Sequence, residues 1–369
     1  MNIIDKKDCF VGPKSKPFVL ILEKIYRFFD RFKKRTATPS TPRRILLCNW
    51  ASLGDLVIAT SIIPPLKHAY PEAKIGFLVA HWTKEVVEKH PDIQWIHTAE
   101  SWKNMRLDQP LWRRFLIYIK SARKARREIK KINYDLSIEL YPFFFNASAL
   151  LWRCRIPERV GFNSAGFSSL LTKSSSWGGK GYLAERYQLL LKELNILVPF
   201  GLTPSLGEVS NVPSDRLKKL IPLSVFKKGY IILHMGSGGL NKEWKEEHWK
   251  KLAETLVSSG HSLIFTGKGS REKNRISNVI SGLHSCYDLC DSICWDDLLF
   301  LIKNTLALVS LDSVTVHIAG AFNKPCIILF LDTYDPSLWS PSHQNCISLI
   351  QKEKEEITPD KVLKSLSCL

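Results

Sequence analysis

The chain has 369 residues, enough for two domains of ordinary size, each with its own hydrophobic core. Its 45% hydrophobic and 24% charged residues are ordinary for a globular protein, and no segment reaches the roughly 20 uninterrupted apolar residues of a membrane-spanning helix. The net charge of +18 is concentrated in residues 1–200, which hold 34 Lys and Arg against 17 Asp and Glu, whereas residues 201–369 hold 19 against 18. This asymmetry predicts an anionic partner for the N-terminal half: nucleic acid, an acidic membrane surface or a phosphorylated substrate. The nine cysteines are scattered without a paired framework, which favours a reducing compartment.

Residues 1–42 form an N-terminal extension. Its first 16 residues are polar and lack the apolar core of a signal peptide. Residues 17–35, "PFVLILEKIYRFFDRFKKR", place apolar side chains at helical spacing with Lys and Arg between and after them. This pattern is typical of a basic amphipathic helix in a membrane interface, and the alternative is a helix packed on the protein's own core. We favour the membrane interpretation because the Pro-containing linker "TATPSTPRR" separates the helix from the first predicted strand.

Strand-like and helix-like segments then alternate, which predicts parallel βαβ units. The first series consists of strands at 45–49, 74–79 and 134–140, helices at 56–70 and 82–90, and a long basic stretch at 113–131. The pattern weakens between about 152 and 210, a region that we expect to be rich in loops. It restarts with strands at 230–235, 262–267, 306–311 and 326–331 and helices at 246–260 and 314–322. We therefore predict one α/β domain over 43–200, a second over 201–350, and a C-terminal helix within 351–369 that packs back on the first domain.

Three loops follow predicted strands, where open parallel sheets bind ligands. In the first, "CNWASLGDL", Ser52 and Gly54 lie in a tight turn and Asp55 stands where a helix begins. Asp55 is either a helix cap or a catalytic carboxylate at the edge of the sheet. Neither interpretation is excluded by the sequence.

The second loop, "HMGSGGLNKEW", brings backbone N–H groups near Gly236, Gly238 and Gly239 to the start of a helix, with Lys242 as a nearby cation. This arrangement predicts an anion site, and the alternative is a surface loop with a solvated lysine.

In the third loop, "SLDSVTVHIAGA", Asp312 ends a strand and Ser313 is placed to cap the next helix. His317 lies one turn into that helix, and a single helical histidine is weak evidence for a site.

Common nucleotide-binding and metal-binding motifs fit poorly. "GSGGLN" and "GKGSRE" each miss the third glycine of G-x-G-x-x-G, with Glu272 in that place in the second, and Lys242 lies outside any Walker A sequence. Nicotinamide dehydrogenases and P-loop NTPases are therefore disfavoured. The four-residue spacing of Cys286, Cys290 and Cys294 raises the possibility of a metal site, but no obvious fourth ligand accompanies it, and the stretch also fits a strand that ends in a loop.

Taken together, residues 43–345 resemble the ADP-heptose:lipopolysaccharide heptosyltransferases of glycosyltransferase family 9. The resemblance rests on three segments in this order, "ILLCNWASLGDLVIATSIIPPLKHAYPEAKIGFLV", "KEWKEEHWKKLAETL" and "LVSLDSVTVHIAGAFNKPCIILF". It implies a GT-B architecture, in which two Rossmann-like domains face each other across a cleft, with the acceptor on the first and the nucleotide sugar on the second.

The resemblance also implies metal-independent transfer with inversion and no cofactor. Asp55 would be the general base and Lys242 would neutralise the departing diphosphate. Ser52 and Gly54 would bind substrate, Ser237 and Gly238 would lie near the diphosphate, and Glu272 at the ribose. Asp312 would hold sugar hydroxyls, Ser313 and the start of its helix would lie near the diphosphate, and His317 is a further substrate-binding candidate. The implied partners are a nucleotide-sugar donor such as ADP-heptose and a phosphorylated lipid A–core acceptor.

The implied location is cytoplasmic, peripheral on the inner face of the inner membrane, with an anionic membrane surface bound through residues 17–35 and 113–131. A nucleic acid is disfavoured because no recognition motif accompanies the basic run. Val314 and Leu331 depart from the family pattern at positions where glycine is usual. They keep two alternatives open: the same fold with another nucleotide sugar in cell-envelope glycan synthesis, and an inactive membrane-associated scaffold.

Overall fold

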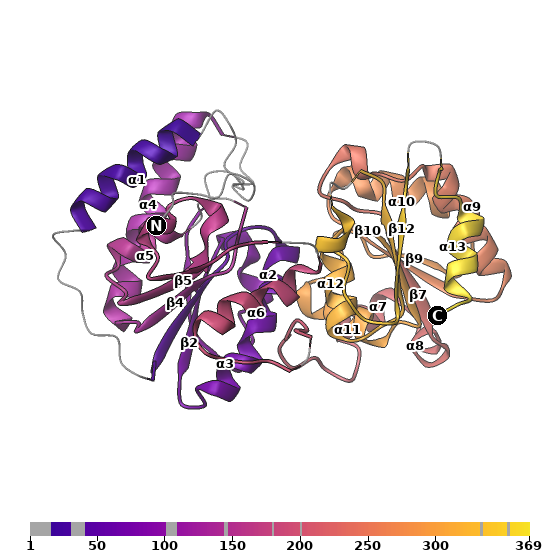
Figure 1. Cartoon of the computed structure of the whole chain (residues 1–369). Helices are drawn as coiled ribbons and strands as arrows, with labels where there is room; N and C mark the ends of the chain where they lie inside the picture. The colour runs from indigo at the N-terminus through magenta and orange to yellow at the C-terminus, as the bar shows by residue number, and fades with distance from the viewer. Residues whose placement is uncertain are drawn as a thin grey trace. The chain divides into compact units, whose positions relative to one another are not determined.

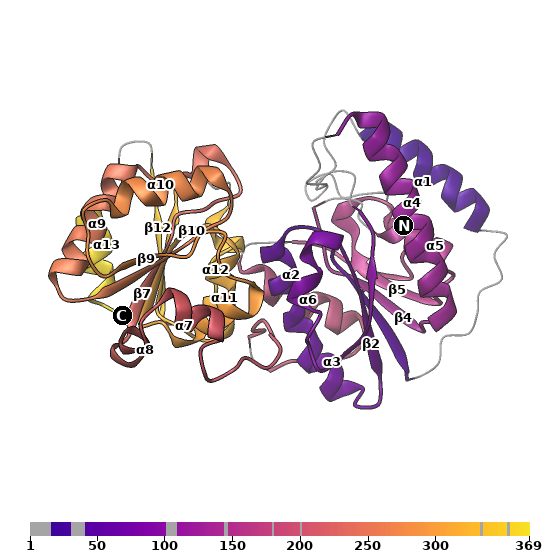
Figure 2. The same ribbon diagram turned by 180° about the vertical axis from the view of Figure 1, so that it is seen from behind.

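The computed structural model describes residues 16–30, 41–100, 109–143, 147–178, 181–199, 201–332, 335–352 and 355–369. The chain divides between Glu208 and Val209 into two compact units, and each unit is built on its own sheet (Figures 1 and 2). Over the described ranges, no helix combines the length and the apolar character that crossing a membrane requires.

The first unit contains a six-stranded parallel sheet in the order β3-β2-β1-β4-β5-β6. The strands are β1 (Arg44–Cys48), β2 (Lys74–Val79), β3 (Ile93–Thr98), β4 (Leu136–Glu139), β5 (Glu158–Phe162) and β6 (Lys173–Ser175). β1 is almost wholly buried because helices cover both faces of the sheet, as is usual for parallel sheets. The order reverses between β1 and β4, where Cys48 pairs with Glu139. The first predicted loop follows β1 and therefore lies at this switch point.

The helices of the first unit lie in two layers (Figure 1). One layer consists of α2 (Leu53–Ala59), α3 (Ile63–Ala69) and α6 (Leu183–Glu193), and the other of α1 (Lys16–Asp30), α4 (Leu111–Ile132) and α5 (Ser148–Arg153). Short 3₁₀ turns complete the unit: η1 (Thr60–Ile62), η2 (His81–Val86), η3 (Asn163–Ala165) and η4 (Ser168–Leu170).

Three expectations for this unit are wrong in detail. The single helix expected over 56–70 is divided into α2, η1 and α3, because Pro64 and Pro65 fit only the first turn of a helix and start a new one. The helix expected over 82–90 is the 3₁₀ turn η2. The region expected to be rich in loops contains β5, β6 and α6.

The second unit has another six-stranded parallel sheet, in the order β12-β11-β10-β7-β8-β9. The strands are β7 (Tyr230–His234), β8 (Ser262–Thr266), β9 (Cys286–Asp288), β10 (Ala307–Leu311), β11 (Cys326–Phe330) and β12 (Cys346–Ile350). The order reverses between β7 and β10, where Ser310 pairs with His234. The two predicted loops that carry Lys242 and Asp312 leave the sheet on either side of this switch point.

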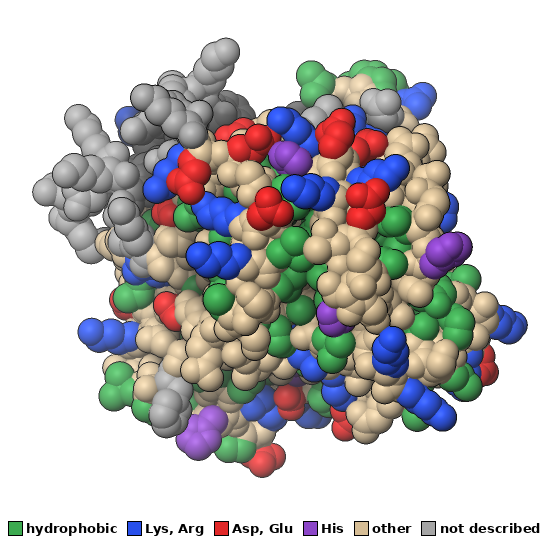
Figure 3. Space-filling view, turned by 90° about the vertical axis from the view of Figure 1, so that its right-hand side faces the viewer, with side chains coloured by type: hydrophobic (Ala, Val, Ile, Leu, Met, Phe, Trp, Pro, Cys, Tyr) green, Lys and Arg blue, Asp and Glu red, His purple; other side chains and the backbone are tan. Residues whose placement is uncertain are grey.

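Helices again cover both faces (Figure 1). They are α7 (Asp215–Leu220), α8 (Leu223–Lys228), α9 (Glu246–Ser258), α10 (Ser270–Ile280), α11 (Trp295–Asn304), α12 (Val314–Ala321) and α13 (Pro359–Leu366), with the 3₁₀ turns η5 (Leu240–Lys242) and η6 (Pro336–Leu338). Figure 3 looks onto the side of this unit and shows Lys and Arg interspersed with Asp and Glu, in keeping with the near balance of charge in its sequence.

The structure corrects the domain boundaries at two places. Residues 201–208 belong to the first unit: the Ser205 N–H donates to Thr60 Oγ1 at 3.0 Å, and Gly207 packs so closely on Lys89 that an added Cβ would lie 2.8 Å from its carbonyl oxygen. The C-terminal helix was expected on the first domain. Instead α13 belongs to the second unit, because its apolar side chains, such as Val362, join the core beneath α9.

Candidate functional site

The centre of the candidate site is an ion pair at the β7–β10 switch point. Lys242 Nζ in η5 lies 2.7 Å from Asp312 Oδ2, which directly follows β10. The lysine side chain is 28% exposed and the aspartate 11%, so that the pair is accessible at the carboxyl edge of the sheet. The sequence placed both residues on strand-end loops, and the structure brings them into contact.

A partly buried histidine beside this pair connects β7 to β8 and to the start of α12. His234, the last residue of β7, shares one hydrogen bond through Nδ1 with Thr266 Oγ1 at 2.9 Å and another through Nε2 with Ser313 Oγ at 3.0 Å. Burial lowers the pKa of His234 to about 4, so the ring is neutral at pH 7. The sequence reasoning missed His234 and Thr266, although a histidine at the end of a buried strand was a usable signal.

The bond to His234 corrects the role expected for Ser313. This residue occupies the N-cap position of α12, but its side chain makes no capping bond to the helix. Its hydroxyl is committed to the imidazole instead. The first N–H groups of α12 are therefore not capped by the Ser313 side chain.

Glu272 lies in the first turn of α10, with its carboxylate between two glycines. A Cβ on Gly236 would lie 2.3 Å from Glu272 Oε2, and a Cβ on Gly267 would lie 2.6 Å from the same atom. Oε2 accepts a hydrogen bond from the Lys268 N–H at 2.9 Å. Burial raises the pKa of the Glu272 carboxyl above its usual value. Gly236 therefore has a specific function in this loop, which is to leave room for Glu272.

The other residues of the glycine-rich loop are less constrained. Ser237 Oγ donates to the Gly239 carbonyl at 2.7 Å and so stiffens the loop from within. A Cβ added to Gly238 would meet nothing within 4 Å, so that its lack of a side chain is not required for packing. Asn241 donates a hydrogen bond to the carboxylate of Asp332, which lies just beyond the end of β11. This bond ties the loop to the end of that strand.

His317 is buried one turn into α12. Burial lowers its pKa to about 4, although the nearby Asp312 carboxylate acts in the opposite direction. The structure thus places His317 beside the predicted site as a neutral packed side chain.

In the first unit, Asp55 is a helix cap. It is the third residue of α2, and with Ser52 at the N-cap it forms a capping box in which the Ser52 N–H donates to Asp55 Oδ2 at 3.1 Å. The Ser52 hydroxyl also donates to Oδ2. Asn49 Nδ2 donates to the Asp55 carbonyl at 3.1 Å. Gly54 lies within the helix, so that the tight turn expected at Gly54 lies before it. The catalytic role of Asp55 stays a prediction.

Two further buried groups lie near this loop and were missed from the sequence. Burial raises the pKa of the Tyr187 hydroxyl on α6 well above its usual value, and the nearby charge of Asp55 raises it further. Glu139 ends β4 beside Cys48, and its carboxylate accepts from the Ala147 N–H at 2.6 Å and from the Ser148 hydroxyl. Glu139 therefore fixes the start of α5 at the β1–β4 switch point.

The structure gives no support to a metal site at the three spaced cysteines. Cys286 begins β9 and Cys294 is the N-cap of α11, so that the alternative of a strand ending in a loop is confirmed. Burial raises the pKa values of the Cys286 and Cys290 thiols to about 11. Throughout the part of the chain that is described, no three His, Cys, Asp or Glu side chains lie close enough to hold a metal ion.

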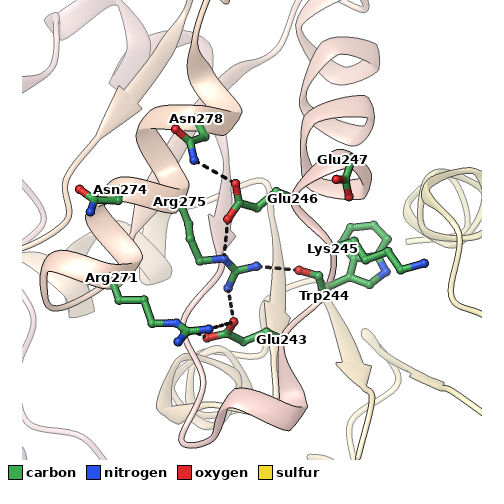
Figure 4. A pocket seen from close by; sticks show the side chains of 9 residues that line it. All are labelled: Glu243, Trp244, Lys245, Glu246, Glu247, Arg271, Asn274, Arg275 and Asn278. Atoms are coloured by element: carbon green, nitrogen blue, oxygen red, sulfur yellow. Dashed lines mark hydrogen bonds and ion pairs between the residues drawn. The ribbon is translucent and has the colours of Figure 1, made fainter.

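A hollow of about 610 Å³ lies between the start of α9 and one side of α10 (Figure 4). Arg271 donates to both oxygens of Glu243 at 3.0 and 2.7 Å, and Arg275 lies between Glu243 and Glu246 at 3.2 and 3.1 Å. These guanidinium groups are neutralised by carboxylates of the same unit. Because Glu243 directly follows Lys242, the network fixes the lysine-bearing segment against α10.

The model of "Glycosyltransferase family 9 (heptosyltransferase)" matches residues 122–366. Lipooligosaccharide heptosyltransferase 2 of Haemophilus ducreyi is 26% identical over 368 residues, with 88% of this chain and 99% of that protein covered. Lipopolysaccharide heptosyltransferase 3 of Escherichia coli is 24% identical over 307 residues, covering 80% and 84%.

Solved structures show the same fold. The family 9 glycosyl transferase of Veillonella parvula superposes with a TM-score of 0.73 at 18% identity, covering 91% of this chain and 99% of that one. An Escherichia coli heptosyltransferase with ADP-2-deoxy-2-fluoro heptose superposes with a TM-score of 0.69 at 18% identity, covering 88% and 99%. The two parallel sheets with helices on both faces therefore match the GT-B heptosyltransferase structures.

Proposed function

The chain belongs to glycosyltransferase family 9, and on that basis we propose that it transfers a heptose from ADP-heptose to the phosphorylated lipid A–core oligosaccharide of lipopolysaccharide. The observation that carries the proposal is the contact between Lys242 and Asp312 at the β7–β10 switch point, where a doubly wound sheet binds nucleotides. A solved relative with this fold was crystallised with a fluorinated ADP-heptose.

The residues of the second unit would divide the donor between them. Lys242 and the N–H groups at the start of α12 provide positive charge for the diphosphate. Asp312, on the other side of the ion pair, is an acceptor for sugar hydroxyls. The carboxylate of Glu272, held between Gly236 and Gly267, is an acceptor for the ribose hydroxyls.

In the proposed reaction, the acceptor hydroxyl attacks the anomeric carbon from the face opposite the diphosphate, which inverts the configuration. The new oxygen–carbon bond forms as the bond between the anomeric carbon and the phosphate oxygen breaks, and ADP leaves with the electron pair. Asp55 takes the hydroxyl proton. That proton becomes acidic only late in the reaction, so the position of the carboxylate, fixed by the Ser52 N–H, matters more than its basicity.

We propose that Lys242 takes the place that a divalent cation occupies in metal-dependent transferases, by neutralising the charge that grows on the departing diphosphate. The expected reaction therefore proceeds in the presence of a chelator. We also propose that the protein works on the cytoplasmic face of the inner membrane, where an acceptor rich in phosphate would meet the basic first unit.

The test is transfer by the purified full-length chain. ADP release from ADP-heptose should require a lipid A–core acceptor and continue in EDTA, and the product should gain one heptose by mass. Release of ADP from ADP-heptose, without release of a nucleoside diphosphate from other nucleotide sugars, supports the proposal. A second candidate, another nucleotide sugar, is favoured by Val314 at the first position of α12, where a β-branched side chain stands beside the expected diphosphate. Preference for a different donor in the same assay would establish that alternative, and no release with any donor would favour a scaffold.

A further inference from the structure

The helix α1 has two different faces, and only one of them packs on the protein. Tyr26 lies edge-on against Trp152 and Phe167, with ring centroids 5.1 and 5.7 Å apart, and Arg153 stacks over its ring at 5.3 Å. The buried Glu23 accepts a hydrogen bond from the Ser169 N–H at 3.1 Å. The helix is therefore a fixed part of the first unit.

The opposite face of α1 is apolar and exposed. Ile21 is 59% exposed, Ile25 47% and Phe28 56%, and with Lys24 they follow the helical spacing of a single stripe. Phe29, at the border of this stripe, is also exposed. Of the two interpretations drawn from the sequence, core packing and a membrane interface, the structure gives one face of the helix to the first and leaves the other face available for the second.

The first two turns of α4 extend the exposed apolar area. Leu111, Trp112, Phe115 and Leu116 are between 50% and 69% exposed. α4 lies next to α1 (Figure 1). Burial raises the pKa of the Tyr118 hydroxyl of α4, and Tyr26 of α1 and Arg153 are close enough to act on it as well. Arg126 of α4 donates to the Arg153 carbonyl at 3.3 Å.

The concentration of apolar side chains on these two helices is unusual. Within the described residues, 15 large apolar side chains are exposed and eight of them lie on α1 and α4, including all four aromatic ones, Phe28, Phe29, Trp112 and Phe115. Scattered exposed apolar residues need no explanation, but a cluster of this kind marks an interaction surface.

The charge of α4 identifies the partner. This helix carries nine Lys and Arg residues and a single acidic residue, Glu128. The basic residues follow the apolar turns along its exposed side, at Lys120, Arg123, Lys124 and Arg127. Aromatic and aliphatic side chains beside a row of cations are what an anionic bilayer binds, since the apolar groups enter the acyl boundary and the cations meet the headgroups.

We propose that the outer face of α1 and the first turns of α4 form one docking surface for an anionic lipid bilayer. The surface is defined by Ile21, Ile25, Phe28, Leu111, Trp112 and Leu116, with the basic residues of α4 beside them. Binding here needs neither donor nor acceptor, so the proposal goes beyond the transfer reaction and can fail or succeed independently of it.

The test is flotation of the full-length protein with vesicles of phosphatidylcholine alone or of phosphatidylcholine with phosphatidylglycerol. We expect binding to the anionic vesicles that weakens with added salt and little binding to the neutral ones. The double variant Ile25→Gln/Phe28→Gln and the double variant Trp112→Gln/Leu116→Gln should each lower the bound fraction by about tenfold or more, since each withdraws two apolar side chains from the interface. Arg123→Gln/Arg127→Gln should weaken binding at low salt.

The matched controls lie in the second unit. Val212→Gln/Leu223→Gln removes two exposed apolar residues and Lys219→Gln/Lys227→Gln removes two exposed charges. Both should bind vesicles like the unsubstituted protein, and melting temperatures should show that every variant is folded.

Equal binding to neutral and anionic vesicles, or unchanged binding of the Ile25/Phe28 variant, would overturn the proposal. Loss of a dimer in that variant, by light scattering, would instead assign the surface to a second copy of the chain. Activity on a soluble acceptor should not change, so failure here is distinct from failure of the proposed transfer.

Discussion

Lys242 and Asp312 are 70 residues apart in the chain, and their side chains meet at 2.7 Å where the strand order of the second sheet reverses. Each charge keeps the other in place at a partly exposed edge. An arriving diphosphate would therefore find a lysine that is already oriented, with no need to order a flexible side chain first.

Lys242→Ala should lower kcat/KM by about 100- to 1,000-fold, because it removes the cation that faces the leaving diphosphate. Donor binding, measured by calorimetry, should weaken as well. The control is Lys245→Ala, three residues further on, whose side chain is exposed and pairs with Glu356 at 2.7 Å. If both variants turned over at the unsubstituted rate, Lys242 would have no part in the site.

Asp55→Asn separates the capping role of Asp55 from its catalytic role. An amide oxygen can still accept from the Ser52 N–H, so we expect a small change in melting temperature and normal donor binding. It cannot take up the acceptor proton, and turnover should fall by about 100- to 10,000-fold. Ser52→Ala is the complementary variant, because it removes the cap at a cost of about 1 kcal/mol and leaves the carboxylate in place. Equal losses of turnover in the two variants would mark Asp55 as a cap alone.

Gly236→Ala and Gly238→Ala form a matched pair within one loop. The methyl group at 236 would displace the Glu272 carboxylate, which is confined on its other side by Gly267, whereas the methyl group at 238 would enter open space. We expect Gly236→Ala to raise the donor KM by about tenfold, the value of a hydrogen bond to a charged group, with little loss of stability because the end of a side chain moves. Gly238→Ala should behave like the unsubstituted protein. Steady-state ADP release distinguishes the two, and equal KM values would remove Glu272 from the donor site.

The two-domain α/β architecture and the Lys242–Asp312 neighbourhood could be predicted because both depend on short-range patterns. Buried strands of a parallel sheet are nearly continuous apolar runs, and their carboxyl ends must share one edge. Once the loop with Lys242 and the residue Asp312 are both known to follow strands, pairing of β7 with β10 brings the two loops to neighbouring strand ends.

The partners of individual polar side chains could not be predicted in this way. Ser313 has the residue type and position of a helix cap, yet its hydroxyl bonds to His234 because tertiary packing places the imidazole 3.0 Å away. The difference between Gly236 and Gly238 likewise depends on where Glu272 lies. The division of the helix over 56–70 was different, since Pro64 and Pro65 were a readable signal for it.

Stability should fall between pH 7 and pH 5 because the folded protein lowers the pKa values of His234 and His317. The pKa values of His234 and His317 are about 4 in the folded protein and near 6.5 when unfolded, so the unfolded chain binds more protons over that interval and is favoured as the pH falls. Each histidine should contribute a loss of about 2 kcal/mol in the free energy of unfolding between pH 7 and pH 5. His234→Gln should remove its share of this loss, as measured by urea unfolding at the two pH values.

His284→Gln, at an exposed position of the same unit, controls for the loss of an imidazole. An unchanged pH dependence in His234→Gln would show that this histidine titrates alike in the folded and unfolded chain. It would also contradict a neutral ring between Thr266 and Ser313.

Adjacent residues on α1 should respond in opposite ways. Tyr26→Ala removes the ring that packs on Trp152 and Phe167, and we expect a loss of about 2 kcal/mol in the free energy of unfolding, since a partly buried aromatic side chain leaves a cavity. Ile25→Gln changes the exposed face and should leave the melting temperature within about a degree, because the side chain is about half exposed and lies outside the cluster around Trp152. Thermal unfolding of the two single variants is the measurement. Equal stability of the two variants would mean that α1 contributes little to the stability of the first unit. The predicted difference would make α1 part of the core of that unit, where Tyr26 packs against the cluster that contains Leu170.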